Sequence, residues 1–255
     1  MICIVNRKFF KNTLATFVIL IACATACRNH DDQIPHLTLN EDPQTVAYQK
    51  NDSLIDHAAT LIRTGDLILR TGTDFSSEEV RSISPADKTY SHAGIAIVDG
   101  NGIFVYHIEP DHLHLTDKVR KEPLDSFCNP KKNLGIAIAR YDLAASEKST
   151  FFAYLEKQYN KQVPFDIHFD LRSTDSMYCS EMIRHGLWLA TSGRLLLPTH
   201  RFNDRNKYKI MRQYLRLPEK SIANREIIPI DHLFLNPHCT MISRFLFHGH
   251  QSRQL

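Results

Sequence analysis

The chain has 255 residues and a mass of 29.4 kDa, which is enough for one domain whose core needs no metal or disulfide staple. Its 31 Lys and Arg residues against 28 Asp and Glu residues leave a formal net charge of only +3. Because this charge is slight and dispersed, it excludes the concentrated basic patch of a nucleic-acid-binding protein. We therefore expect one folded domain behind a leader, with no nucleic-acid partner.

The N-terminus has the layout of an export signal. Arg7, Lys8 and Lys11 precede an uncharged apolar stretch over residues 13–26, and a polar segment begins abruptly at Arg28. The apolar stretch is shorter than the about 20 residues of a membrane-spanning helix, so cleavage or lipidation is favoured over a permanent transmembrane anchor. We expect the mature protein to work outside the cytoplasm.

Residues 20–23 read Leu-Ile-Ala-Cys, which resembles the bacterial lipoprotein signal, where a small residue precedes the cysteine that is lipidated and becomes the mature N-terminus. Cys23 is the predicted lipidation site, and Cys27 is a poorer competitor. An ordinary signal peptide, with cysteines as apolar filler, is the alternative. We expect a membrane-anchored lipoprotein of the cell envelope, on its periplasmic or cell-surface side. Its predicted parts are a lipoprotein-type signal peptide over 1–22, a polar tether over 23–43 and a folded domain over 44–255.

The folded domain is predicted to begin with a helix and a short strand. Apolar residues recur at helical spacing over 48–63, and Thr64-Gly65 ends that segment. Residues 66–70 read as a strand, and the polar segment from there to Ser91 reads as a loop or short helix.

A β-hairpin is the clearest element of the sequence. The apolar, β-rich runs 92–98 and 103–108 flank Asp99-Gly100-Asn101-Gly102. Because Asn and Gly tolerate the positive φ of a tight turn, this pattern predicts two paired strands.

The second half of the domain is predicted to mix helices with strands. Residues 134–141 read as a strand, and 146–159 and 179–189 read as helices with one apolar face. A strand that runs into a short helix is predicted over 227–233, and the pattern after Leu235 favours no one structure.

Six cysteines divide evenly between leader and body. The leader cysteines are Cys3, Cys23 and Cys27, and those of the body are Cys128, Cys179 and Cys239. An odd number in the body leaves at least one thiol free. In an oxidising compartment Cys128 and Cys239 could form a disulfide bond, which would leave Cys179 as the free thiol.

Cys179 is the candidate nucleophile because it stands at the predicted start of a helix. Unpaired N–H groups and the helix dipole favour the thiolate there. The alternative is a buried structural cysteine, a common fate of a free thiol.

His92, at the mouth of the first hairpin strand, is the candidate base, since imidazole titrates near neutrality. Glu109, at the end of the second strand, is the candidate orienter of that imidazole. His107 and Asp111 are alternatives for the orienting role. The non-catalytic alternatives are that His92 is a hydrogen-bonded strand histidine and that Glu109 is a solvated carboxylate.

Several segments together resemble a known family, the permuted papain-like hydrolases of the YiiX/YebB type, which are circularly permuted relatives of the NlpC-type cell-wall peptidases. The matching segments are Gly65-Asp66-Leu67-Ile68, Ser91-His92-Ala93-Gly94-Ile95, residues 106–109, Pro164-Phe165-Asp166, Tyr178-Cys179-Ser180-Glu181 and residues 228–233. The Tyr-Cys-Ser-Glu signature is the most specific of these segments.

The resemblance implies an α+β fold with a central antiparallel β-sheet packed against helices. It implies catalysis by Cys179 as nucleophile, His92 as base and Glu109 as orienter. The expected activity is that of an exported cysteine amidase or peptidase, which hydrolyses the amide bond of a cell-wall (peptidoglycan) peptide or an N-acyl amino acid through an acyl-thioenzyme.

Two other functions stay open at this point. One is a lipid-directed acyltransferase or esterase with the same three residues, which predicts an apolar acyl site near Cys179. The other is a non-catalytic envelope binding protein that kept the fold. The histidines near Glu109 also suggest the hypothesis of a metal site. The spacing of His107, Glu109, His112 and His114 fits no common zinc pattern, so no metal or cofactor is expected.

Overall fold

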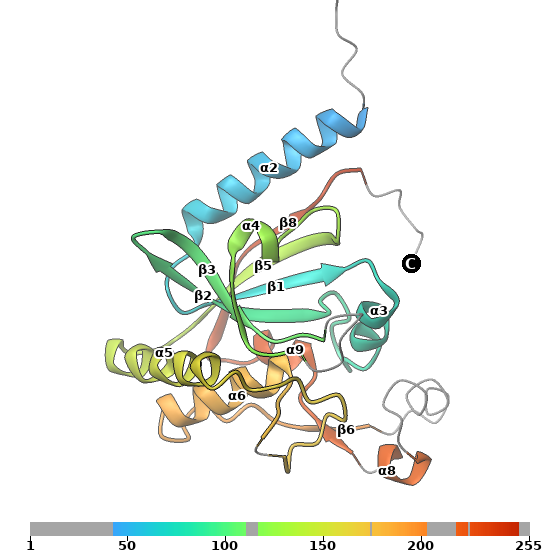
Figure 1. Cartoon of the computed structure of the whole chain (residues 1–255), viewed down its shortest axis with the longest axis vertical. Coiled ribbons are helices and arrows are strands. Elements are labelled where there is room, and N and C mark those ends of the chain that lie inside the picture. The colour runs from blue at the N-terminus through green and yellow to red at the C-terminus, as the bar shows by residue number, and fades with distance from the viewer. Residues whose placement is uncertain (1–42, 111–116, 174, 203–217, 224, 250–255) are drawn as a thin grey trace, which may run out of the picture. The chain divides into compact units, whose positions relative to one another are not determined.

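The computed structural model of the chain describes residues 43–110, 117–173, 175–202, 218–223 and 225–249 (Figure 1). The predicted signal peptide and the predicted tether, except its last residue Pro43, lie outside these residues, and so do the candidate orienter Asp111 and the pair His112 and His114. Within the described part of the chain, none of the helices combines the length and apolar character that crossing a membrane requires.

Six strands form a central sheet in the order β4-β3-β2-β1-β5-β8, and every neighbouring pair is antiparallel. The strands are β1 (Asp66–Gly72), β2 (His92–Asp99), β3 (Gly102–His107), β4 (Arg120–Pro123), β5 (Asn133–Tyr141) and β8 (Cys239–Leu246). A separate two-stranded sheet pairs β6 (His200–Arg201) with β7 (Glu226–Ile227).

All seven residues of β1 are buried, which agrees with its position inside the sheet. Side chains alternate between the two faces of a strand, so Leu67 and Leu69 enter one core and Ile68 enters the other. A strand that is apolar on both faces must have layers above and below it.

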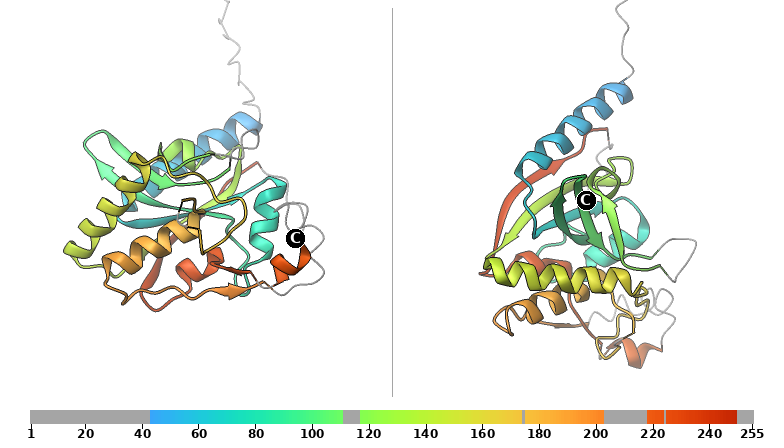
Figure 2. Two further views of the ribbon diagram at one scale, coloured as in Figure 1. Left: turned by 60° about the horizontal axis from the view of Figure 1, so that its bottom comes forward. Right: turned by 60° about the vertical axis from the view of Figure 1, so that its left-hand side comes forward.

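Helices supply those two layers, as Figures 1 and 2 show. The core that contains Leu67 is completed by α5 (Ala145–Asn160), α6 (Cys179–Ala190) and α9 (Ile230–Phe234). The core that contains Ile68 is completed by α2 (Pro43–Leu61) and α4 (Leu124–Phe127). Two further helices, α3 (Phe75–Ser82) and α8 (Glu219–Ala223), complete the elements of the described residues.

The predicted hairpin is confirmed as β2 and β3, and the predicted helices and strands on either side of it are present. The segment between the first two strands contains α3, which agrees with the expected loop or short helix. The predicted strand and short helix near residue 230 are β7 and α9.

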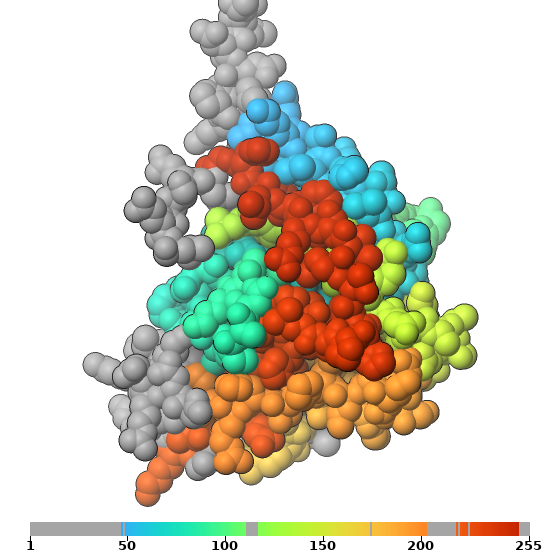
Figure 3. Space-filling model, turned by 180° about the vertical axis from the view of Figure 1, so that it is seen from behind, coloured from blue at the N-terminus to red at the C-terminus, as the bar shows by residue number. Residues whose placement is uncertain are grey.

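Five elements were not predicted, namely β4, α4, β6, α8 and β8. Strand β8 occupies the edge of the sheet beside β5 and contacts α2. Figure 3, from behind, shows these C-terminal residues (red) beneath the blue helix α2.

The cysteines of the described residues are all free thiols, so the bridge between Cys128 and Cys239 is not formed. The sheet separates them: Cys128 is buried in the core under α2 and α4, and Cys239 packs against the opposite core.

Candidate active site

The first turn of α6 is fixed by the neighbours of Cys179 in the sequence. The Tyr178 hydroxyl accepts a hydrogen bond of 2.9 Å from the Ile228 N–H, and the Ser180 hydroxyl donates one of 2.6 Å to the Ile228 carbonyl. The Glu181 carboxyl accepts from the Tyr178 N–H at 3.3 Å and caps the helix. The Tyr-Cys-Ser-Glu signature is therefore a clamp that holds Cys179 against the segment after β7.

A buried turn at Asp166 also fixes the position of Cys179 at the start of α6. Asp166 is 4% exposed, and its carboxylate accepts from the N–H groups of His168 and Asp170. Its own N–H donates to the Met177 carbonyl at 3.0 Å, two residues before Cys179. The Pro164-Phe165-Asp166 segment thus has a structural role in the position of the helix start.

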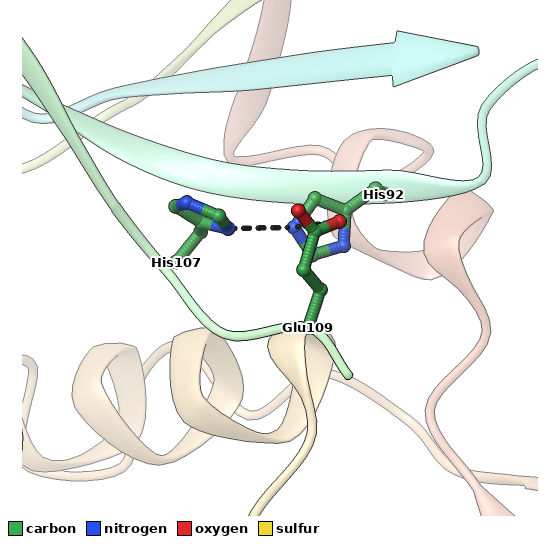
Figure 4. A group of neighbouring side chains, drawn as sticks. All are labelled: His92, His107 and Glu109. Atoms are coloured by element: carbon green, nitrogen blue, oxygen red, sulfur yellow. Dashed lines mark hydrogen bonds and ion pairs between the residues drawn. The ribbon is translucent and has the colours of Figure 1, made fainter. Parts of the chain in front are cut away.

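His92 and His107 meet because one begins β2 and the other ends β3. Nε2 of His92 lies 3.0 Å from Nδ1 of His107, and Figure 4 shows the two rings joined by this hydrogen bond. Gly94 leaves room for this approach, since a Cβ there would overlap Val105 and stand 3.1 Å from the Cβ of His107.

Two side chains that the sequence analysis did not single out hold the His107 ring. Nε2 of His107 lies 3.0 Å from a carboxylate oxygen of Glu122 on β4. The fully buried ring of Phe127 packs against both imidazoles, with ring centroids 5.7 Å from His92 and 4.9 Å from His107. No local pattern pointed to either residue, since their partners lie on other strands.

Glu109 lies beside the two histidines but is engaged elsewhere. Its Oε2 is 3.8 Å from Nε2 of His92, longer than a hydrogen bond, and it accepts from the Arg70 guanidinium. Arg120 lies 3.9 Å from its other oxygen. Arg70 had a signal in the sequence, as the one cation of its strand and the residue directly after the apolar run Leu67-Ile68-Leu69.

Cys179, His92 and Glu109 line one cavity of about 280 Å³. The Cys179 sulfur is hydrogen-bonded to the backbone of Ala93 and Ser180, so the helix start reaches the residue next to His92. The charged lining groups are Arg70, Asp74, Glu109, Arg120, Glu122 and Lys132. The apolar ones include Val80 and Ile83 in and next to α3, Phe165 and Phe169 before α6, and Ile227, Ile228 and Ile230 from β7 to the start of α9.

The resting protonation of the site differs from the expected thiolate. Burial raises the pKa of the Cys179 thiol to about 11, although the hydrogen bonds from the backbone of Ala93 and Ser180 act in the opposite direction. Burial, followed by the positive charge of Arg70, holds the pKa of His92 well below 6.5. Near neutral pH the site is therefore a neutral thiol beside a neutral imidazole.

His92, His107 and Glu109 also present a possible metal-ligand set, with one ligand atom from each lying within 4.8 Å of the others. Each of these groups already has a partner, in the pair of histidines and in the ion pair of Glu109 with Arg70. The guanidinium groups of Arg70 and Arg120 beside Glu109 oppose a second cation. The arrangement fits a hydrogen-bonded network better than a divalent metal.

Comparisons with known proteins agree with this arrangement of sheet and helices. The crystal structure of the metalloprotein YiiX from Escherichia coli O157:H7 is similar, with a TM-score of 0.55 and 17% sequence identity over 71% of this chain and 96% of that one. At this identity the similarity establishes the permuted papain-like fold. No curated protein matched the sequence at a significant level.

The family model described as a permuted papain-like amidase enzyme of the YaeF/YiiX type, family C92, matches residues 61–197. The matched region is more than half of the chain and contains His92, His107, Glu109 and Cys179. The chain therefore belongs to the permuted papain-like amidases, which are cysteine hydrolases.

Proposed function

We propose that this amidase is an exported, lipid-anchored enzyme of the cell envelope in which Cys179 is the nucleophile and His92 is the general base. The observation that carries the proposal is the shared cavity of the two side chains, with the backbone of Ala93 hydrogen-bonded to the Cys179 sulfur. The apolar leader and the Leu-Ile-Ala-Cys segment support export and lipidation at Cys23.

The neutral resting pair favours proton transfer during attack. His92 takes the thiol proton as the sulfur of Cys179 bonds to the amide carbon, and the resulting oxyanion is stabilised by N–H groups at the start of α6. The C–N bond then breaks, and His92 returns the proton to the leaving amine. Water attacks the thioester while His92 accepts its proton, the C–S bond breaks, the departing sulfur of Cys179 takes that proton back, and the carboxylic acid leaves.

We assign the orienting role to His107, in place of Glu109. His107 is in hydrogen-bond contact with Nε2 of His92, whereas Glu109 is 0.8 Å farther from that atom, at 3.8 Å against 3.0 Å, and is paired with Arg70. Glu109 then serves to neutralise Arg70 at the wall of the cavity.

The cavity supports a substrate with one apolar part and one charged part. Its apolar lining suits an acyl group, and its charged lining suits an amino acid on the other side of the amide bond. We therefore propose N-acyl amino acids as the first substrate class and peptidoglycan peptides as the second. The same apolar lining is the observation that favours a lipid-directed acyltransferase or esterase as the second candidate function.

The test is hydrolysis by the purified full chain, compared with the Cys179→Ala and His92→Ala variants. The substrates are N-acyl amino acids of increasing acyl length, a peptidoglycan stem peptide and a phospholipid ester. Cys239→Ala is the matched control, because it removes a thiol that does not line the cavity. We expect hydrolysis of the N-acyl amino acids to be lost in the first variant and to fall at least about 100-fold in the second.

Each other result has its own consequence. Cleavage of the phospholipid ester alone would assign the lipid-directed function. Binding of a substrate without turnover, unchanged in Cys179→Ala, would assign an envelope binding protein and overturn the proposal.

A further inference from the structure

We propose that Glu122 is a positioning residue that sets, through His107, which nitrogen of His92 carries the proton, and so leaves Nδ1 of His92 as the basic atom. This inference rests on the proposed function of His92 as base. It assigns a role in the reaction to a carboxylate on the edge strand β4, fifteen residues from His107 in the chain.

The hydrogen bond between Glu122 and His107 fixes the position of the proton on His107. An ionised carboxylate can only accept hydrogen bonds, so the proton between these groups belongs to Nε2 of His107. The same hydrogen bond holds the pKa of Glu122 below its usual range, which keeps this carboxylate ionised near neutral pH.

The hydrogen bond between the two rings then fixes the position of the proton on His92. If His107 is neutral, its proton on Nε2 leaves a lone pair on Nδ1, and this Nδ1 lies 3.0 Å from Nε2 of His92. Nε2 of His92 must then be the donor. Nε2 of His92 therefore carries the proton of that ring, and the lone pair of His92 is on Nδ1.

The opposite arrangement shows why the anchor matters. If His107 carried its proton on Nδ1, it would donate to Nε2 of His92 and force the proton of His92 onto Nδ1. The nitrogen left free to take the Cys179 proton would then be the one already occupied by His107. An orienting group that is itself a histidine can adopt both tautomers, so it needs an anchor that a carboxylate orienter would not need.

The strand register places Glu122 where it can act. It pairs with Val105 on β3, two residues before His107 and on the same face of that strand. Its side chain is 26% exposed and that of His107 is 0% exposed, so the contact spans from the cavity wall to the buried ring. Glu109 has no equivalent contact, because Arg70 and Arg120 lie against its oxygens.

The experiment compares Glu122→Gln with Glu109→Gln in the full chain labelled with 15N-histidine. Both changes convert a carboxylate into an amide, and the two side chains are similarly exposed, at 26% and 27%. An amide can donate as well as accept, so only Glu122→Gln releases the tautomer of His107. The readouts are the 15N and 1H chemical shifts that report the protonated nitrogen of each histidine, together with kcat and KM for the amide substrate.

We expect wild-type His92 to carry its proton on Nε2 and Glu122→Gln to show a mixture of tautomers. In that variant kcat should fall by about 10-fold or more while KM stays within about 2-fold, since geometry is retained and the tautomer is wrong. Glu122→Asp, which keeps the charge, should restore the wild-type tautomer and much of kcat.

Two results would overturn the proposal. One is an unchanged tautomer and kcat in Glu122→Gln, and the other is a proton on Nδ1 of His92 in the wild type. Loss of activity in Cys179→Ala or His92→Ala tests the proposed function separately, and the tautomer signals can be read in a chain with no activity. Circular dichroism shows whether each variant is folded, and if Glu122→Gln is not, the protonated nitrogen of His92 in the wild type carries the test.

Discussion

At the scale of single residues, Cys179 combines a helix N-terminus with burial, and the two features have opposite effects on the pKa of its thiol. The helix start favours the thiolate, whereas burial disfavours any charge at this depth. Burial prevails, and it raises the pKa of the Cys179 thiol to about 11. We expect the rate of Cys179 alkylation by iodoacetamide to rise about 10-fold per pH unit between pH 7 and 10.

The rate is measured by mass spectrometry of the Cys179 peptide, with the half-buried Cys239 as the internal comparison. A plateau that begins near pH 7 would show that a thiolate is already present in the resting site and would contradict this prediction.

The imidazole of His92 gives a second prediction at this scale. Burial and the nearby positive charge of Arg70 hold the pKa of His92 well below 6.5, so this proposed base is unprotonated throughout the neutral range. We expect kcat/KM to lose activity only when the pH falls well below 6.5. In Arg70→Gln the acid limb should move upward, because a positive charge is removed and Glu109 is left unpaired beside His92. Lys132→Gln, a change to another cation of the cavity lining, should leave the limb in place.

Cys179 and His92 could be singled out from sequence because each lies inside a short local signature. The orienting group could not be decided in the same way. His107 and Glu109 are two residues apart at a strand end, and the choice between them depends on Arg70 and Glu122, which lie on β1 and β4. Contacts across strands are set by register, and a single sequence does not show register directly.

At the scale of elements, α6 carries a buried acid in its first turn. Glu181 is fully buried, one of its oxygens has no hydrogen-bond partner among the described residues, and burial raises its pKa to about 8. Its pKa in the unfolded chain is near 4.5, so the folded state holds this proton more tightly. The stability that the neutral acid contributes is therefore complete below pH 4.5 and is lost as the pH rises through about 8.

We expect Glu181→Gln to become progressively more stable than the wild type as the pH rises from about 5 to 8, by at most about 1.4 kcal/mol per pH unit. The measurement is urea unfolding at several pH values, and the exposed carboxyl of Glu226 supplies the control variant Glu226→Gln. A stability difference that does not change with pH would show that Glu181 is ionised in the folded protein.

The packing of α6 against α5 depends on a helical glycine. A Cβ on Gly186 would overlap the ring of Phe151 and lie 2.9 Å from Tyr154, both on α5. We expect Gly186→Ala to destabilise the protein by about 1–3 kcal/mol, despite the better helix propensity of alanine. Gly100→Ala, in the hairpin turn with no atom within 4 Å of its Cβ, should change stability by less than about 0.5 kcal/mol. Equal effects of the two changes, measured by thermal unfolding, would contradict close packing at this crossing.

The elements that the sequence predicted are those with strong internal periodicity, and the two missed strands of the central sheet lie at its edges. The hairpin has two apolar runs and an Asn-Gly turn, so its pattern is complete within 17 residues. Strand β4 reads Arg-Lys-Glu-Pro, and β8 is mostly half-exposed. Edge strands of this kind are formed by pairing with an existing sheet, which local patterns do not reveal.

At the scale of the whole molecule, the permuted fold brings the proposed nucleophile Cys179 and the proposed base His92 together from different layers. Cys179 begins a helix that covers one face of the sheet, whereas His92 begins a strand within it. The base precedes the nucleophile in the chain, and this order is immaterial because the geometry of the site defines its chemistry. The two side chains can meet only if the start of α6 is fixed beside β2, and the hydrogen bonds of Tyr178 and Ser180 with Ile228 fix it there.

The predicted leader bears on where the proposed active site meets its substrate. If Cys23 is lipidated, burial of the acyl chains at about 0.8 kcal/mol per methylene holds the mature chain at a membrane surface, close to acylated substrates. We expect a chain produced in a bacterial host to incorporate labelled fatty acid and to partition into detergent. Cys23→Ser should lose both properties, and Cys27→Ser, the matched control, should keep them. Loss of the label in Cys27→Ser alone would move the anchor by four residues, whereas a cleaved, unlabelled chain in all three would replace lipidation with ordinary export.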